Sequence, residues 1–306
     1  MHGALHLGYH YVRNGAAPGP NCSPARLQQQ IQALKSDGYE FLTCGEVTDR
    51  IAQMSPLPEK HVTLSFDDGL KDQITTALPI LEEEDVPATF FIITCALDGK
   101  IPPVIGFQAL IVKLGAERLE KEILPKVFEG TPFVDLLDSK LAPWIEDTKK
   151  LGEARGLRRI KWMFNHCVPQ ALKREKLEEM FEEYVGPRAE TALVQEYFMD
   201  RSDIQALARA GMEIGSHTVT HPDLTVTGVD EIEIELGQSA ATLLEMVSVL
   251  SFAWTFSSDI RSKARAVADR HYDSSWNFRS AWNKLPENLY HDLTDIPRLH
   301  EQVFNP

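Results

Sequence analysis

The chain has 306 residues, of which 43% are hydrophobic and 25% are charged. This is the composition of a soluble globular protein, with enough chain for one large domain or two small ones. The formal net charge of −14 repels nucleic acid and anionic membrane surfaces, so we expect neither as a partner. The sequence has no apolar stretch of the ~20 residues that a membrane-spanning helix needs, so no transmembrane segment is expected.

The cysteines and the N-terminus bear on the cellular compartment. The four cysteines, Cys22, Cys44, Cys95 and Cys167, stand far apart and form no C-x-x-C pair. This spacing favours reduced thiols over a disulfide framework or a zinc ribbon. Residues 1–7 lack a basic segment followed by a long apolar run and so do not resemble a secretory signal. We therefore expect a cytoplasmic protein.

The chain begins with a strand followed by a well-punctuated helix. Residues 7–12 have the composition of a strand. A helix is predicted over 24–37 because Ser23 is a natural N-cap and Pro24 suits the first helical position. Gly38 suits the left-handed conformation that often follows a helix.

Strands and helices continue to alternate beyond this helix. After a short extended segment at 40–43, residues 61–66 alternate apolar and polar side chains, which is typical of a strand. A helix is predicted over 75–84 and a buried strand over 88–94. Strands that alternate with helices of this length indicate a parallel α/β sheet or barrel.

The pattern changes over residues 97–200. Long segments there carry acidic and basic side chains three or four residues apart, which is typical of solvated helix faces. We predict a helical insertion packed beside the α/β framework, near the carboxyl ends of the strands. The charge runs need no ligand to explain them.

The α/β alternation then resumes. We predict a helix over 203–210 with Ser202 as its N-cap, a strand at 212–216, a helix within 229–246 and a strand at 249–254.

Asp67 and Asp68 stand where the predicted strand 61–66 ends. In parallel α/β folds, active sites are assembled at the carboxyl ends of strands. Two adjacent carboxylates could serve chemistry there. The alternative is that one caps the next helix and the other is solvated.

His217 and His221 also follow a predicted strand. Their i, i+4 spacing would let two imidazole nitrogens meet one metal ion. Thr218, Val219 and Pro222 favour a turn over a helix. Two unrelated loop histidines are the alternative. Taken together with a carboxylate from 67–68, however, the pair would make a metal site with open positions for water and substrate, suited to amide or ester hydrolysis.

The two segments resemble the motifs of one family. Ser65-Phe66-Asp67-Asp68-Gly69 is similar to the T/S-F-D-D-G motif of the polysaccharide deacetylases, the NodB homology or carbohydrate esterase family 4 group, and His217-Thr218-Val219-Thr220-His221 is similar to its H-[ST]-x-x-x-H motif. The resemblance implies that Asp67 is the catalytic base and that Asp68, His217 and His221 bind the metal. It covers about 5–96 and 200–300.

The same resemblance carries an expectation for the fold. It implies a distorted (β/α)-barrel of about seven strands. Residues 1–306 would form a single catalytic domain, with the helical insertion at about 97–200 lying outside the similarity.

A third segment departs from the family. Residues 252–257 resemble the family's F-A-Y-P-[FY]-G segment, whose backbone helps to bind the oxyanion, but Trp254, Thr255 and Ser257 replace the usual Tyr, Pro and Gly. The loss of Pro and Gly predicts a changed loop geometry.

The remaining candidates are isolated residues. The family's Leu-x-His motif, which supplies a general acid, is not matched cleanly, so His300 and His291 are candidates beside the alternative of ordinary exposed histidines. His10 resembles the Tyr-His pair of some members and is a candidate for the pocket wall. Trp254 and Trp276 could offer flat faces to a sugar, with core packing as the alternative.

These observations predict a metal-dependent hydrolase that removes an N-acetyl group from a carbohydrate, such as a precursor of a surface polysaccharide. Zinc is the expected ion, with cobalt, nickel, manganese and iron as alternatives. A deformylase, another amide hydrolase of the same fold, and a weakened carbohydrate-binding module remain alternative functions.

Overall fold

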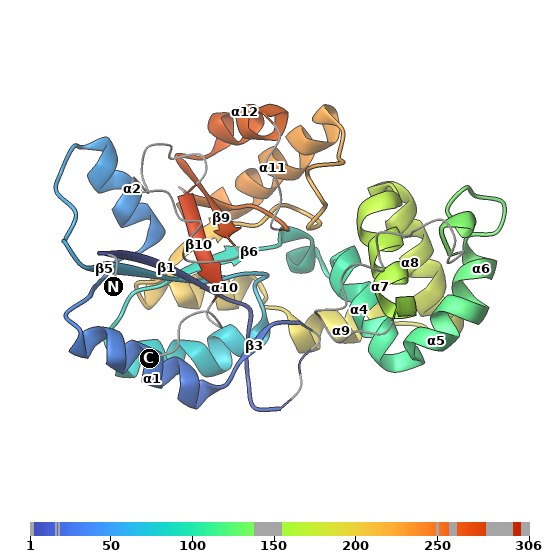
Figure 1. Ribbon diagram of the computed structural model, residues 1–306, viewed down its shortest axis with the longest axis horizontal. Coiled ribbons are helices and arrows are strands. Elements are labelled where there is room, and N and C mark those ends of the chain that lie inside the picture. The colour runs from blue at the N-terminus through green and yellow to red at the C-terminus, as the bar shows by residue number, and fades with distance from the viewer. Residues whose placement is uncertain are drawn as a thin grey trace.

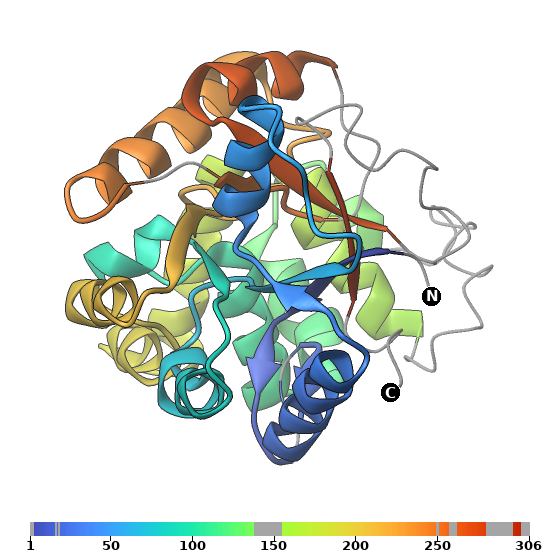
Figure 2. The ribbon, with the colours of Figure 1, turned by 90° about the vertical axis from the view of Figure 1, so that its left-hand side faces the viewer.

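The computed structural model describes residues 3–15, 17, 19–137, 155–248, 251–256, 262–279 and 296–300. Within these residues, seven parallel strands pair in a closed circuit that helices surround (Figure 2). The strands of the circuit, in order around it, are β1 (Ala4–Tyr9), β5 (His61–Phe66), β6 (Thr89–Ile92), β7 (Glu213–Ser216), β8 (Ser251–Ala253), β9 (Ser274–Arg279) and β10 (Ile296–His300). The expected barrel of about seven strands is confirmed.

Three short strands lie outside this circuit. β4 (Glu40–Phe41) pairs with the beginning of β5, while β2 (Tyr11–Val12) and β3 (Asn21–Cys22) form a separate two-stranded ribbon. The strand predicted over 7–12 is therefore interrupted at His10. The strand expected at 249–254 is shorter, because only Ser251–Ala253 pair with their neighbours among the described residues.

The alternation along β5 separates the barrel interior from the outer layer. Val62, Leu64 and Phe66 pack in the core formed with the surrounding helices. The intervening side chains form hydrogen bonds inside the barrel, where Thr63 contacts His6. This two-residue period also directs Asp67 toward the barrel interior.

The helices that cover the barrel are α1 (Pro24–Ser36), α2 (Cys44–Ala52), α3 (Leu78–Glu83), α10 (Arg201–Arg209), α11 (Val229–Leu244) and α12 (Ser262–His271). Ser23 caps α1 by accepting from the Arg26 N–H, and Gly38 follows with a φ of 79°, both as predicted. The predicted cap of α10 is wrong. Asp200 is the N-cap in place of Ser202, because its carboxylate accepts from two backbone N–H groups of the first turn.

The described residues of 97–200 form a helical region with a core of its own. Its helices are α4 (Pro103–Leu114), α5 (Ala116–Arg118), α6 (Leu124–Val127), α7 (Arg155–Trp162), α8 (Gln170–Tyr184) and α9 (Ala189–Tyr197). In Figure 1 they gather at the right of the molecule, beside the barrel. Phe107 and Phe164 stack at 4.1 Å in their centre. The described part of this span contains no barrel strand.

The two ends of the insertion are bonded to the loops that follow β7 and β5. Immediately before it, the Thr94 and Cys95 N–H groups donate to the carbonyls of Thr218 and Val219. At its end, the Met199 N–H donates to the Gly69 carbonyl. The insertion therefore lies at the carboxyl-terminal end of the barrel. No helix in the described parts of the chain is both long and apolar enough to cross a membrane.

Candidate metal and catalytic site

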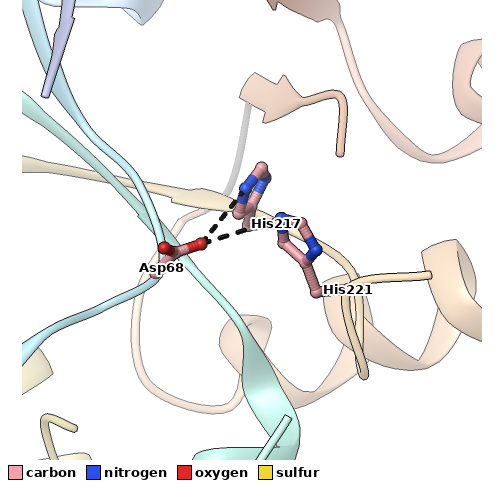
Figure 3. A group of neighbouring side chains, drawn as sticks. All are labelled: Asp68, His217 and His221. Atoms are coloured by element: carbon pink, nitrogen blue, oxygen red, sulfur yellow. Dashed lines mark ion pairs between the residues drawn. The ribbon is translucent and has the colours of Figure 1, made fainter. Parts of the chain in front are cut away.

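Asp68, His217 and His221 converge at the carboxyl ends of β5 and β7. One ligand atom from each lies within 4.8 Å of the others. Asp68 Oδ1 is 3.6 Å from His217 Nε2 and 3.8 Å from His221 Nε2. Figure 3 shows the carboxylate facing the two imidazoles, whose ring centroids are 4.9 Å apart. This is the spacing of one carboxylate and two imidazoles around a single ion.

The backbone that presents these side chains is in an unfavourable conformation. Asp68, Thr218 and His221 have φ values of 77°, 69° and 59°. The left-handed region is costly for non-glycine residues, and especially for a β-branched one such as Thr218. The turn predicted between the histidines is confirmed. Its strained geometry lets both rings face Asp68.

Hydrogen bonding fixes the form of His217. Its Nδ1–H donates to the Ala253 carbonyl at 2.8 Å, which leaves a lone pair on Nε2, the nitrogen that faces Asp68. Burial lowers the pKa of His217, an effect that the charge of Asp67 partly opposes. Burial, and then the nearby His217, lower the pKa of His221. Neutral imidazoles with an available nitrogen are the form that binds metal.

One oxygen of the Asp68 carboxylate has no hydrogen-bond donor within the described part of the protein. This oxygen, Oδ1, is buried. Burial and the negative charge of Asp67 raise the pKa of Asp68 to about 8, although Arg298 opposes this rise. A buried carboxylate normally requires a cation or several donors. The donor set therefore fits a divalent cation.

Asp67 is held by a buried arginine from β10. Arg298 Nη1 donates to Asp67 Oδ1 at 2.7 Å, and Arg298 Nη2 donates to Oδ2 at 2.8 Å. Both side chains are almost fully buried. Burial alone would raise the pKa of Asp67, but the Arg298 guanidinium lowers it to about 2. Asp67 is therefore ionised, and its orientation is fixed by a bidentate pair.

Sequence reasoning did not identify Arg298. The available signal was a single cation within the run Ile296-Pro297-Arg298-Leu299-His300, which forms a strand. A cation inside a barrel strand requires an acidic partner, since burying an unpaired charge is costly.

Glu235 of α11 was also missed, and it holds the loop between the two histidines. Its carboxylate accepts from the N–H groups of Val219 at 2.9 Å and Thr220 at 2.8 Å, and from the Thr220 hydroxyl. Ser239, one turn further along α11, donates to the Thr218 carbonyl at 3.1 Å. The loop is thereby bonded to a helix.

In the segment at the end of β8, Trp254 and Thr255 replace the family's usual Tyr and Pro, and both form hydrogen bonds to neighbouring segments. The Thr255 hydroxyl donates to the Pro222 carbonyl and so joins this segment to the histidine loop. The backbone N–H of Trp254 donates to the backbone carbonyl of Trp276 at 3.0 Å, so this N–H is not available to an oxyanion. Phe256 has a φ of 55°, and its ring lies 5.0 Å from that of His221. Ser257 lies outside the described residues.

Both tryptophans pack in the core, which was one of the two interpretations that the sequence allowed, and the candidate role of Trp254 in substrate binding is corrected. Trp254 is 3% exposed and packs edge-on against Phe252 in the barrel core, and Trp276 is fully buried beside His6. Neither offers an open face to a sugar, because each ring fills space among apolar side chains.

The structure places only some of the other candidate histidines, which are His10, His291 and His300. His10 lies next to Asp67, because the Gln73 side chain donates to the backbone carbonyls of both. In β10, the backbone of His300 pairs with that of Gly8 in β1. The side chain of His300 is outside the described part of the structure. His291 lies outside the described residues.

The architecture and this site define the class: a (β/α)-barrel with an Asp-His-His set beside an ionised aspartate at the carboxyl ends of its strands. The family profile of the polysaccharide deacetylases matches residues 55–113 and 172–269, just over half of the chain. The chain belongs to the polysaccharide deacetylase family, as its motifs predicted.

One curated relative is the poly-beta-1,6-N-acetyl-D-glucosamine N-deacetylase of Escherichia coli K12, which is 31% identical over 90 residues. The match covers 29% of this chain and 13% of that protein, so the chain spans a small part of its relative.

Solved structures share the fold. The Streptococcus pyogenes deacetylase PplD aligns over 99% of this chain and 98% of its own, with a TM-score of 0.58 and 16% identity. A de-N-acetylase from Aggregatibacter actinomycetemcomitans aligns over 97% and 94%, with a TM-score of 0.60 and 16% identity.

Proposed function

We propose that this protein is a metal-dependent N-deacetylase that hydrolyses the acetamido group of an N-acetylated hexosamine in a polysaccharide or its precursor. The observation that carries the proposal is the convergence of Asp68, His217 and His221 beside Asp67, which Arg298 keeps ionised. Amide hydrolysis requires an electrophilic centre, a base for water and a proton for the leaving amine.

Asp68, His217 and His221 would hold the cation. Two neutral imidazoles and one carboxylate suit zinc, and they also accept cobalt, nickel, manganese or iron. A divalent ion bound there supplies Lewis acidity that activates water and polarises the acetyl carbonyl. The three residues leave its remaining positions open for water and substrate.

Asp67 would accept the proton of the attacking water. Both of its oxygens bind Arg298, which prevents the carboxylate from rotating. A base fixed in one orientation needs no reorganisation when the water approaches. Its low pKa keeps Asp67 in the accepting form throughout the ordinary pH range.

The proposed substrate class comes from the family and from the E. coli relative, whose name specifies poly-beta-1,6-N-acetyl-D-glucosamine. We infer that the acyl donor is an N-acetylglucosamine unit. Oligomers of different linkage therefore form the substrate panel.

The test is acetate release from β-1,6- and β-1,4-linked N-acetylglucosamine oligomers, by protein prepared without a histidine tag and analysed for bound metal. We expect acetate release that a chelator abolishes and that zinc or cobalt restores. A formylated oligomer provides the comparison for deformylase activity. Oligomer binding without release of either acid would contradict the proposal and favour a binding module.

A further inference from the structure

The two histidines of the candidate metal site are held in different ways. His217 donates from Nδ1 to the Ala253 carbonyl at 2.8 Å, so a hydrogen bond of its own ring orients it. The Nδ1 of His221 is buried and has no hydrogen-bond partner in any other described residue. Histidines that bind metal almost always donate their second ring nitrogen to a carbonyl or a carboxylate. The orientation of the His221 ring must therefore come from the loop that carries it.

The loop is in a conformation that needs support from its surroundings. His221 has a φ of 59°, and such left-handed geometry persists only where neighbouring structure enforces it. The hydrogen bonds from α11 hold Thr218, Val219 and Thr220 and extend no further along the loop. The stretch around His221 itself is held by other parts of the chain.

The helical insertion contacts this loop on both sides of His221. Gln170, the first residue of α8, donates from Nε2 to the Thr220 hydroxyl oxygen at 2.8 Å. His166 donates from Nδ1 to Asp223 Oδ2 at 2.6 Å. Gln170 and His166 both lie between the two stretches that match the family profile, which end at 113 and resume at 172. These contacts therefore come from the part of the insertion that the profile does not cover.

The contact of Gln170 has a defined direction. The Thr220 hydroxyl donates its one proton to Glu235 Oε1, so it can only accept from Gln170. The amide nitrogen of Gln170 must face Thr220 for this reason, although its Oε1 is then buried without a donor among the described residues. Thr220 thereby connects α8 of the insertion with α11 of the barrel.

The contact of His166 is made to a fixed carboxylate. Asp223 is buried, and its second oxygen, Oδ1, accepts from the N–H and the hydroxyl of Thr225. The Phe256 ring contacts both histidines, 5.1 Å from the ring of His166 and 5.0 Å from that of His221. The insertion therefore contacts the loop directly at Asp223 and indirectly at the His221 ring.

We propose that Gln170 and His166 are positioning residues that hold the metal ligand His221, an inference that rests on the metal site of the function proposed above. Their two hydrogen bonds to the loop take the place of the ring hydrogen bond that His221 lacks. The helical insertion thereby sets the affinity of the site for its cation.

Zinc affinity of chelator-treated protein, measured by isothermal titration calorimetry without any sugar, tests this role. Gln170→Leu and His166→Phe keep most of the side-chain volume and remove the donor. Each should weaken zinc binding about tenfold, and the two together roughly a hundredfold. His166→Asn places an amide N–H where Nδ1 stood, so it should bind zinc within a fewfold of wild type. An Asn variant as weak as His166→Phe would contradict the role of this hydrogen bond.

Two matched controls remove the same donors elsewhere. The Gln32 amide donates to Glu84 at 2.7 Å on the surface of the barrel, and His271 Nε2 bonds Glu233 at 2.7 Å. Gln32→Leu and His271→Phe should bind zinc as wild type does. Losses equal to those of the insertion variants would show a general loss of stability and would overturn the proposal.

The His221→Ala background provides the decisive comparison. Without the ligand that they position, Gln170→Leu and His166→Phe should weaken the remaining zinc binding no further, whereas independent effects would add. Additive losses, or unchanged zinc affinity of both variants in the wild-type background, would contradict the positioning role alone. A wild type that binds zinc but releases no acetate from any oligomer would contradict the proposed function alone.

Discussion

Asp67 and Asp68 are neighbours in sequence but lie in opposite environments. Asp67 faces the barrel interior and forms two hydrogen bonds with Arg298, whereas the buried Oδ1 of Asp68 faces two neutral imidazoles. The left-handed φ of Asp68 turns the chain between these two directions. One carboxylate is therefore suited to proton transfer and the other to binding a cation.

Because the two aspartates have different roles, their substitution should impair activity in different ways. Asp67→Asn keeps the shape but removes the base, so it should retain metal and lower turnover by roughly 10²–10⁴-fold. Asp68→Ala removes a direct ligand, so it should lose metal, with activity partly restored by excess ion. Metal analysis and acetate release check both. An empty Asp67→Asn beside a loaded, inactive Asp68→Ala would reverse the assignment.

The Asp67–Arg298 pair also predicts a coupled effect on stability. Arg298→Met leaves a buried carboxylate without its cation and should lower the free energy of unfolding by about 3–5 kcal/mol at neutral pH. Asp67→Asn added to Arg298→Met should recover part of this loss. Denaturant unfolding of the four proteins measures the coupling. Additive effects would show that the two side chains do not stabilise each other.

The difference in the free energy of unfolding between wild type and Arg298→Met should depend on pH with a defined sign. The pKa of Asp67 in the folded protein is about 2, below the ordinary 3.8, so the pair stabilises the fold above pH 3.8 and that contribution is lost as the pH falls toward 2. The gap between wild type and Arg298→Met should therefore narrow over this interval. A gap that widens on acidification would contradict the pairing.

At the residue scale, the sequence predicted the groups that stand in compact motifs. Asp67, Asp68, His217 and His221 lie within two segments of five residues, so their chemistry is visible locally. Arg298 pairs with Asp67 across 231 positions, and no spacing in the sequence connects them. Trp254 illustrates a different limit, because an aromatic residue at a strand end is compatible with a sugar platform as well as with the core in which it lies.

At the scale of elements, α11 positions the histidine loop. Glu235 accepts three hydrogen bonds from Val219 and Thr220, which lie between the two ligand histidines. Supporting groups of this kind determine how well a metal site is organised before binding. The charged period of 97–200 predicted helices correctly, yet it did not indicate which side chains meet the barrel. Gln170, whose side chain donates to the Thr220 hydroxyl at 2.8 Å, was missed for that reason.

Glu235→Gln tests this support. The amide loses the negative charge and part of the acceptor capacity toward the loop N–H groups, so metal affinity should fall about 10–100-fold. Isothermal titration calorimetry with the metal ion measures this affinity. Glu233→Gln, two residues away on α11 and 43% exposed, should leave affinity unchanged, because its pairs with Arg270 and His271 are partly solvated. Equal losses in both variants would assign the effect to helix stability.

At the scale of the whole molecule, the candidate site joins parts of the chain that are distant in sequence. Asp68 follows β5 and the histidines follow β7, with β6 between these strands in the barrel. The helical insertion leaves from the end of β6, and its two ends bond the same two loops. A cation at the site would therefore connect the barrel strands on either side of the insertion.

This arrangement predicts that metal stabilises the entire fold. A ligand that binds only the folded state adds about 2.7 kcal/mol to the free energy of unfolding at a hundred times its Kd. Zinc should therefore raise the denaturation midpoint of chelator-treated protein, because the unfolded chain separates Asp68 from both histidines. His221→Ala should lose most of this gain, while His271→Gln, whose ring binds Glu233 away from the site, should keep it. Equal stabilisation of both variants by zinc would place the binding elsewhere and would contradict the assignment of Asp68, His217 and His221 as its ligands.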